Sequence, residues 1–179
     1  MSRVPTVAER MMNVRALVCD VDGVLTDGRL NYAGDDEIKS FSVADGFGIT
    51  LAKQAGWHVA FLTARGGVAV ERRARELSVH LEIGQRKKGE AFLALCEKFQ
   101  LSAANVAYMG DDWLDLPAMQ LAGLAATVPN AAAAVRQRAQ WLASVEGGSG
   151  AVRELIEAVL RVQGKLDGLL ATYLKGEGA

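Results

Sequence analysis

The sequence contains few cysteines and few histidines, and both shortages exclude classes of protein. Two cysteines among 179 residues cannot supply a disulfide framework, and neither Cys19 nor Cys96 has neighbours at the spacing of metal ligands. Both are interpreted as reduced thiols of a cytoplasmic protein. His58 and His80 stand alone beside predicted strands, where a structural role is favoured over a ligand role.

The sequence also lacks an excess of one charge and a long apolar run. Twenty basic residues stand against 21 acidic ones, which gives a net charge of −1 and no basic run to attract nucleic acid. The apolar runs are far shorter than a membrane span, and residues 1–13 lack the apolar centre of a signal peptide. We therefore expect no nucleic-acid partner, no membrane partner and one domain over residues 1–179.

Short apolar segments alternate with helical patterns along most of the chain. Strands are predicted at 16–19, 57–62, 79–84, 105–109, 124–128 and 141–145, and helices at 45–56, 68–77, 88–99, 114–122, 131–139 and 152–162. This alternation predicts an α/β fold with a mainly parallel sheet between two layers of helices. The tail, residues 164–179, has little apolar periodicity.

Residues 29–43 interrupt this alternation with two extended segments, 29–32 and 38–43, around turn residues 33–37. They predict a protruding β-hairpin. A hairpin alone is marginally stable, so its apolar side chains require a partner. We expect that partner to be another subunit.

Polar side chains directly follow three of the predicted strands. Asp20 and Asp22 follow the first, Thr63 follows the second, and Asp111 and Asp112 follow a later one. Ligands of parallel sheets bind at the carboxyl ends of the strands, where these side chains would meet. Positions i and i+2 of an extended chain point the same way, so the first two carboxylates can face one volume. An Asp-rich turn is the alternative interpretation of these two alone.

Carboxylates held close together repel one another, and a bound cation would offset this repulsion. Mg²⁺ is the usual cation because it prefers oxygen ligands. A carboxylate beside such a cation can attack phosphorus and form an aspartyl-phosphate. A second carboxylic acid can protonate the leaving oxygen and later deprotonate water.

Four motifs, in order, resemble those of the haloacid dehalogenase superfamily of phosphohydrolases, which has a Rossmann-like fold. They lie at residues 20–26, 62–65, 85–88 and 110–115. The resemblance implies that Asp20 is the nucleophile and that Asp22 is the acid/base. It implies a Mg²⁺ site made by Asp20, Asp111 and Asp22, the last through its backbone carbonyl.

The same resemblance assigns the remaining site residues. Thr63 would hold a phosphoryl oxygen, although an N-cap is its alternative role, and Lys88 would neutralise developing charge. Lys88 is favoured over Lys87, and a solvated helix start is the alternative for both. Asp112 and Asp115 would orient the lysine or the waters of the metal.

The gaps between motifs leave no room for a cap domain, so an open site must be completed by another subunit. Beyond the four motifs, the stretches 20–28, 45–49, 105–108, 110–112, 150–154 and 163–167 resemble those of a capless group with such a hairpin, the 3-deoxy-D-manno-octulosonate 8-phosphate (KDO 8-phosphate) phosphatases of lipopolysaccharide synthesis. That resemblance implies a homotetramer assembled through the hairpins, a tail that can reach a neighbour's site, and an anionic sugar acid phosphate as substrate. The substrate-binding residues that it implies, besides Asp22 and Lys88, are Asp45, Gly46, Arg65 and Arg73.

Three positions depart from this family's pattern. Ala44, Thr50 and Ser149 stand where the family usually has basic residues, so the exact sugar is left open. A nine-carbon sugar acid 9-phosphate, or a broad range of sugar phosphates, is the alternative substrate. A catalytically silent sugar-phosphate-binding scaffold is the non-enzyme alternative. A receiver domain is disfavoured because its acceptor Asp lies on a later strand than its acidic pair, and a phosphomutase because a cap is missing.

Overall fold

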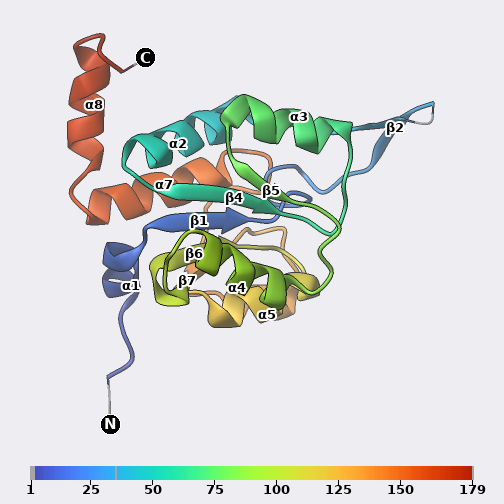
Figure 1. Cartoon of the computed structure of the whole chain (residues 1–179), viewed down its shortest axis with the longest axis horizontal. Helices are drawn as coiled ribbons and strands as arrows, with labels where there is room; N and C mark the ends of the chain where they lie inside the picture. Colours follow the sequence, from blue (N-terminus) through green and yellow to red (C-terminus); the bar gives the residue numbers. More distant parts are fainter. Residues whose placement is uncertain (1–2, 35, 179) are drawn as a thin grey trace.

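A six-stranded parallel sheet forms the centre of the computed structural model, which describes residues 3–34 and 36–178 (Figure 1). The strand order is β5-β4-β1-β6-β7-β8, and every neighbouring pair is parallel. The strands are β1 (Ala16–Cys19), β4 (His58–Leu62), β5 (His80–Glu82), β6 (Val106–Met109), β7 (Leu124–Thr127) and β8 (Trp141–Leu142). The predicted parallel α/β fold is confirmed.

Helices cover both faces of this sheet. In Figure 1, α2 (Val43–Gln54), α3 (Val68–Leu77) and α7 (Ala151–Val162) lie on one face, and α4 (Lys88–Lys98) and α5 (Leu116–Leu121) lie on the other. All four residues of β1 have no exposed surface, because this central strand has a neighbour on each side and helices on both faces. Over the part of the chain that the structure describes, every helix is too short or too polar to cross a bilayer.

Two helices lie where the sequence pattern predicts none. Helix α1 (Val7–Asn13) begins with a capping box between Thr6 and Glu9. Helix α8 (Leu166–Leu174) occupies most of the tail and places Tyr173 edge-on to Phe47, with ring centroids 5.2 Å apart. The capping box supports α1, and contacts with distant residues support α8, so both helices form despite weak periodicity. In contrast, the helix predicted at 131–139 is shorter in the structure, where α6 spans Ala133–Arg136.

The hairpin is shorter than predicted but protrudes as expected. Strands β2 (Asn31–Ala33) and β3 (Asp36–Ile38) pair antiparallel, and Asp35, predicted at the turn, lies outside the described residues. The second strand ends at Ile38, because Phe41 turns back to pack against the core. Tyr32 is 65% exposed at the projecting end, which lies on the same side of the molecule as the carboxyl ends of the sheet (Figure 1).

Candidate active site

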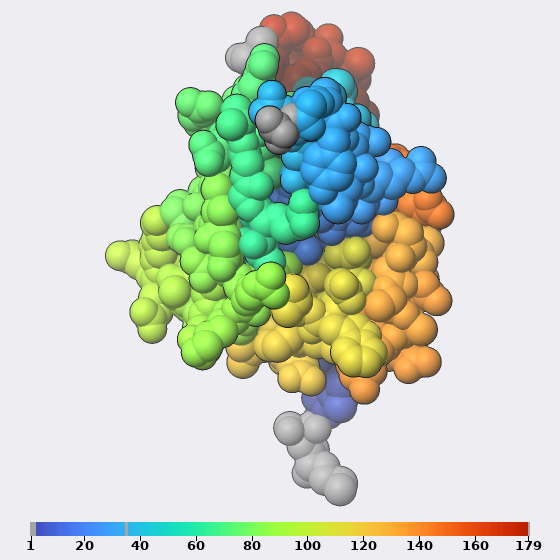
Figure 2. All heavy atoms as spheres, turned by 90° about the vertical axis from the view of Figure 1, so that its right-hand side faces the viewer, coloured from blue at the N-terminus to red at the C-terminus, as the bar shows by residue number. Residues whose placement is uncertain are grey.

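Three adjacent strands deliver polar residues to one edge of the sheet. Asp20 follows β1, Thr63 follows β4, and Gly110 and Asp111 follow β6, while β1 pairs with both β4 and β6. Figure 2 faces this edge, where segments far apart in the sequence, coloured blue, green and yellow, come together. They enclose a cavity of about 360 Å³ whose walls include Asp20, Asp22, Thr63, Arg65, Lys88 and Asp111.

Three carboxylates gather in this cavity. Asp20, Asp111 and Asp115 each place an oxygen within 4.8 Å of the other two. Gly23 makes the approach possible, because a Cβ on this residue would lie 2.0 Å from Oδ2 of Asp111. Its φ of +91° is also a conformation that favours glycine. The glycine that follows the first carboxylate pair therefore leaves room for Asp111.

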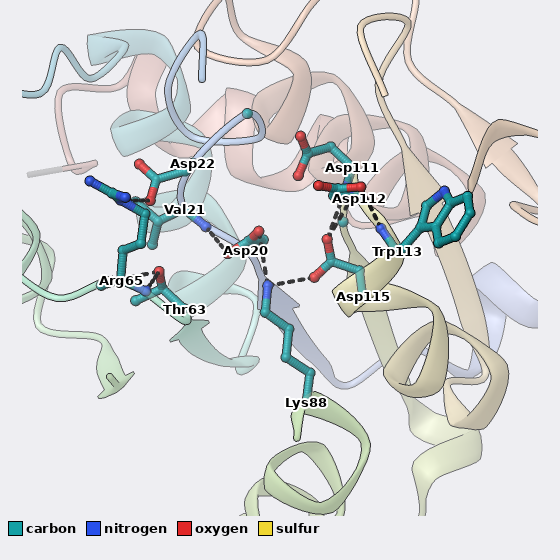
Figure 3. Close-up of polar contacts among 12 residues, drawn as sticks. Asp20, Val21, Asp22, Thr63, Arg65, Lys88, Asp111, Asp112, Trp113 and Asp115 are labelled. Atoms are coloured by element: carbon teal, nitrogen blue, oxygen red, sulfur yellow. Dashed lines mark hydrogen bonds and ion pairs between the residues drawn. The ribbon is translucent and has the colours of Figure 1, made fainter. Parts of the chain in front are cut away.

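Asp115 holds Lys88 in place. Its Oδ1 accepts a hydrogen bond from Lys88 at 2.6 Å, while Oδ2 accepts from the backbone N–H groups of Asp111 and Asp112 (Figure 3). Oδ1 also accepts from the hydroxyl of Tyr108 at 2.7 Å. Lys88 is 1% exposed, and its Nζ also lies 2.9 Å from Oδ2 of Asp20. The lysine is thus fixed between two carboxylates, and Asp115 has its oxygens satisfied.

The electrostatics of the cluster favour an added cation. Burial, together with the charge of Asp115, raises the pKa of Asp20 to about 7, although Lys88 opposes the shift. Burial and the charges of Asp20 and Asp115 raise the pKa of Asp111 to about 8. Burial alone would lower the pKa of Lys88, but Asp20 and Asp115 outweigh it and raise that pKa. One lysine therefore does not neutralise the carboxylates around it.

Asp22 faces a different set of partners. Its carboxylate makes an ion pair with Lys39, and its Oδ2 lies 3.9 Å from Nε of Arg65. Lys39 comes from the base of the hairpin, has a side chain only 2% exposed, and also pairs with Glu37 at 2.7 Å. Arg65 completes the ring through an ion pair of 3.0 Å with Glu37. Two cations therefore hold the Asp22 side chain away from the carboxylate cluster.

The structure places Thr63 and Asp112 on the walls of the cavity. The Thr63 hydroxyl donates to the backbone carbonyl of Arg65 at 2.9 Å and accepts from its N–H at 3.1 Å. This contact closes a local turn, whereas α3 begins after Gly67, so Thr63 is not a helix cap. Asp112 is exposed and accepts a hydrogen bond from the N–H of Trp113.

Three residues predicted to bind substrate lie outside this cavity. Asp45 is 1% exposed and accepts a hydrogen bond from the N–H of Arg153 at the start of α7. A Cβ on Gly46 would lie 2.3 Å from a guanidinium nitrogen of Arg73. Arg73 itself donates to the carbonyl of Ser42 at 3.1 Å. Within one chain, these residues connect α2 to α3 and α7, and the structure does not bring them to the carboxylates.

The sequence pattern missed three side chains that belong to the site or support it. Lys39 has no local signal, because its contact with Asp22 depends on the antiparallel pairing that returns the chain to the base of the hairpin. Tyr108 reads as an ordinary strand residue, yet its hydroxyl bonds to Asp115. Arg86 lines the cavity. It lies in the third motif, two residues before Lys88, but the motif predicts no function for it.

The donor set fits a magnesium ion. Carboxylate oxygens are the ligands that Mg²⁺ prefers, and several waters usually complete its shell. Asp111 Oδ1 is buried without a hydrogen-bond partner among the described residues, which is costly unless a ligand or water satisfies it. Asp115 accepts four hydrogen bonds, whereas each oxygen of Asp20 has one partner among the described residues, so Asp20 and Asp111 have the lone pairs available to a cation. The Asp22 side chain points elsewhere, which leaves its backbone carbonyl as its means of contact.

The metal-free protein is expected to lose stability as the pH rises from about 5 to about 8. Asp20 and Asp111 have ordinary pKa values of 3.8 when exposed, against about 7 and about 8 in the folded chain. Between these values the folded chain retains protons that the unfolded chain has released, so raising the pH favours unfolding. Mg²⁺ binds the deprotonated carboxylates and should therefore raise the Tm more at pH 8 than at pH 5.5.

Thermal unfolding in EDTA and in Mg²⁺ across this pH range tests the expectation. Asp111→Asn is the matched control, because it removes one titrating group without changing its size and should flatten the dependence in EDTA. A metal-free Tm that rises steadily from pH 5.5 to pH 8 would contradict the assignment.

A family model described as haloacid dehalogenase-like hydrolase matches residues 73–155. The parallel sheet, the carboxylates at the ends of β1 and β6 and the lysine between them agree with that match. Together they define the class of the protein as a haloacid dehalogenase-like hydrolase.

Closer relatives narrow the class to a family. The chain is 44% identical over 166 residues to the 3-deoxy-D-manno-octulosonate 8-phosphate phosphatase KdsC of Salmonella typhimurium. This alignment covers 91% of this chain and 88% of that protein. The crystal structure of the Moraxella catarrhalis phosphatase, in complex with magnesium ion, phosphate ion and KDO, matches with a TM-score of 0.90 at 36% identity, covering 93% of this chain and 97% of that one. The cobalt-bound enzyme of Haemophilus influenzae matches with a TM-score of 0.89 at 36% identity, over 92% of this chain and 99% of that one. The chain belongs to the family of the 3-deoxy-D-manno-octulosonate 8-phosphate phosphatases.

Proposed function

We propose that the protein hydrolyses 3-deoxy-D-manno-octulosonate 8-phosphate to the free sugar acid and phosphate, a step in lipopolysaccharide precursor synthesis. The observation that carries this proposal is the arrangement of Asp20, with Lys88 at 2.9 Å and Asp111 in the same carboxylate cluster. Phosphoryl transfer depends mainly on positioning and charge neutralisation, and this arrangement supplies both. Similarity to KdsC over most of both chains supports the substrate class.

The first half of the reaction uses Asp20 as the nucleophile. A carboxylate oxygen of Asp20 attacks phosphorus, the bond from phosphorus to the sugar oxygen breaks, and an aspartyl-phosphate forms. Val21 N–H donates to Asp20 Oδ1 at 2.7 Å and Lys88 approaches Oδ2, so the carboxylate is held in one orientation. Lys88 and Thr63 would contact phosphoryl oxygens, and the lysine would offset charge that develops on them.

Asp22 acts as the acid and then as the base in this proposal. It gives a proton to the leaving sugar oxygen, and later takes one from the water that attacks phosphorus and releases phosphate from Asp20. Lys39 and Arg65 hold its carboxylate in the present conformation. Proton transfer therefore requires the Asp22 side chain to turn from them toward the substrate oxygen.

Asp20 and Asp111, with the backbone carbonyl of Asp22, would hold the magnesium ion. When bound, the ion supplies positive charge that offsets the carboxylates and the phosphoryl group. Asp115 and Asp112 would support the site, the first by fixing Lys88 and the second by orienting water.

Phosphate release from a panel of sugar phosphates, with Mg²⁺ and with EDTA, tests the proposal. The eight-carbon acid 8-phosphate should give the highest kcat/KM, and EDTA should remove activity. A higher kcat/KM for a nine-carbon acid 9-phosphate would instead support the alternative suggested by Ala44, Thr50 and Ser149. No turnover of any phosphate in Mg²⁺ would favour a silent binding protein.

We also propose that the protein is a single-domain homotetramer that assembles through residues 29–43 and works in the cytoplasm. Leu30, Tyr32 and Ile38 are about half exposed or more on the hairpin. The hairpin adjoins the open cavity, because Glu37 and Lys39 pair with Arg65 and Asp22, which line it. Two buried free thiols agree with a reducing compartment. Helix α8 lies at the far end of the molecule from the strand carboxyl ends, so a tail that closes an active site would close a neighbour's (Figure 1).

Light scattering should give four times the mass of one chain. Replacing exposed Leu30 with glutamate should reduce that mass, because a charge would be buried in the interface. A fully active wild-type monomer would overturn the assembly.

A further inference from the structure

Three basic side chains line the active-site cavity, and two of them are already paired. Lys88 lies between Asp20 and Asp115, at 2.9 and 2.6 Å. Arg65 pairs with Glu37 at 3.0 Å and reaches toward Asp22 (Figure 3). Arg86 makes no ion pair within 4.0 Å and no hydrogen bond with any residue of 3–34 or 36–178. It is therefore the unpaired cation of the cavity.

Arg86 and Lys88 occupy different depths. Lys88 is 1% exposed and Asp20 is 8% exposed, so both belong to the floor, where phosphorus must lie for Asp20 to attack it. Arg86 is exposed, in the loop between β5 and α4, two residues before the lysine. A substrate with its phosphate on the floor must extend its other end toward the mouth, where Arg86 is available.

The proposed substrate has a second anionic group at that other end. In 3-deoxy-octulosonate 8-phosphate the carboxylate and the phosphate terminate opposite ends of the carbon chain. A planar guanidinium binds a carboxylate through two parallel hydrogen bonds. None of Ala44, Thr50 and Ser149, the positions where the resembled family usually has basic residues, lines this cavity in a single chain. The cavity thus retains one free cation for a substrate with one further negative charge.

We propose that Arg86 binds the carboxylate of the sugar acid and makes the enzyme prefer acid substrates to neutral sugar phosphates. This inference rests on the proposed phosphatase function and adds the residue that recognises the leaving group. Arg86 is a specificity residue in this view and takes no part in the chemical steps at phosphorus.

The test compares substrates that share a phosphate and differ in the carboxylate. The pairs are the octulosonate 8-phosphate and 6-phosphogluconate, which are acids, against glucose 6-phosphate and p-nitrophenyl phosphate, which are not. Arg86→Ala should raise KM for the acids roughly ten- to a hundredfold, the range expected for a lost charge-assisted hydrogen-bond pair. Its kcat/KM for the neutral phosphates should stay close to the wild-type value, and Arg86→Lys should recover part of the loss.

Lys87→Ala is the matched control. Lys87 is the next residue, is exposed, and pairs with Glu90 at 3.2 Å without lining the cavity. The Lys87→Ala variant also loses one positive charge next to the cavity. Its KM and kcat/KM should equal the wild-type values for both acid and neutral substrates.

The remaining outcomes would contradict either the role proposed for Arg86 or the proposed phosphatase function. Equal losses on acid and neutral substrates would make Arg86 a phosphate contact, and no loss on either would make it a solvated loop residue. If the wild type ignores the octulosonate phosphate but its preference for 6-phosphogluconate depends on Arg86, the proposed substrate fails and carboxylate recognition stands. If the wild type hydrolyses only neutral phosphates, both fail.

Discussion

Asp20→Asn is expected to lower phosphate release by at least about 10³-fold, because the amide cannot act as the attacking oxygen. The substitution keeps the size of the side chain and the hydrogen bond from the N–H of Val21 to Oδ1. Steady-state release of phosphate in Mg²⁺ measures the loss. A rapid-quench search for phosphorylated protein should find the aspartyl-phosphate in the wild type and none in the variant.

Loss of fold is not expected to explain that result. Burial and Asp115 make the charged form of Asp20 costly, as its pKa of about 7 indicates, and Lys88 keeps Asp115 as a partner. The metal-free variant should therefore unfold at a temperature equal to or above that of the wild type at pH 8. Asp27→Asn makes the same chemical change at an exposed position seven residues on, and should retain activity. Substantial turnover by Asp20→Asn would refute the nucleophile assignment.

The strand ends could be predicted from sequence because each signal is local. Asp20, Thr63 and Asp111 directly follow apolar strands, and parallel strands place their carboxyl ends at one edge. Which strands are neighbours is a tertiary property, but β1 pairs with both β4 and β6, so all three residues meet.

The contacts that orient these residues could not be predicted. Asp45 and Gly46 are predicted to bind substrate only through the family resemblance, yet Asp45 accepts a hydrogen bond from the N–H of Arg153, which is 108 residues away along the chain. Lys39 reaches Asp22 only because the antiparallel return of the hairpin brings the chain back to its base, beside the end of β1. The tail forms α8 because its leucines and Tyr173 find partners on α2 and α7. Hydrophobic periodicity is a local pattern and cannot predict contacts between residues this far apart in the sequence.

Lys88→Met is expected to destabilise the metal-free protein by about 3–5 kcal/mol, the usual cost of leaving buried charges without their partner. The methionine fills much of the same space, so a cavity contributes little, while Asp20 and Asp115 lose the cation between them. Activity should fall by at least about 10²-fold, since a charge that stabilises the transferring phosphoryl group is removed. Urea unfolding and steady-state phosphate release measure the two effects.

The dependence on pH and metal separates this mechanism from simple loss of packing. Without Lys88 the pKa of Asp20 should rise further, so the folded chain takes up a proton and the destabilisation should be smaller at pH 5.5 than at pH 8. Mg²⁺ should restore part of the stability at pH 8, because it replaces positive charge, yet little of the activity. Lys87→Met is the control, since its side chain is 79% exposed and pairs only with Glu90 among the described residues. A loss of stability in Lys88→Met that is the same at both pH values and indifferent to Mg²⁺ would show that packing, and not charge, holds this lysine in the core.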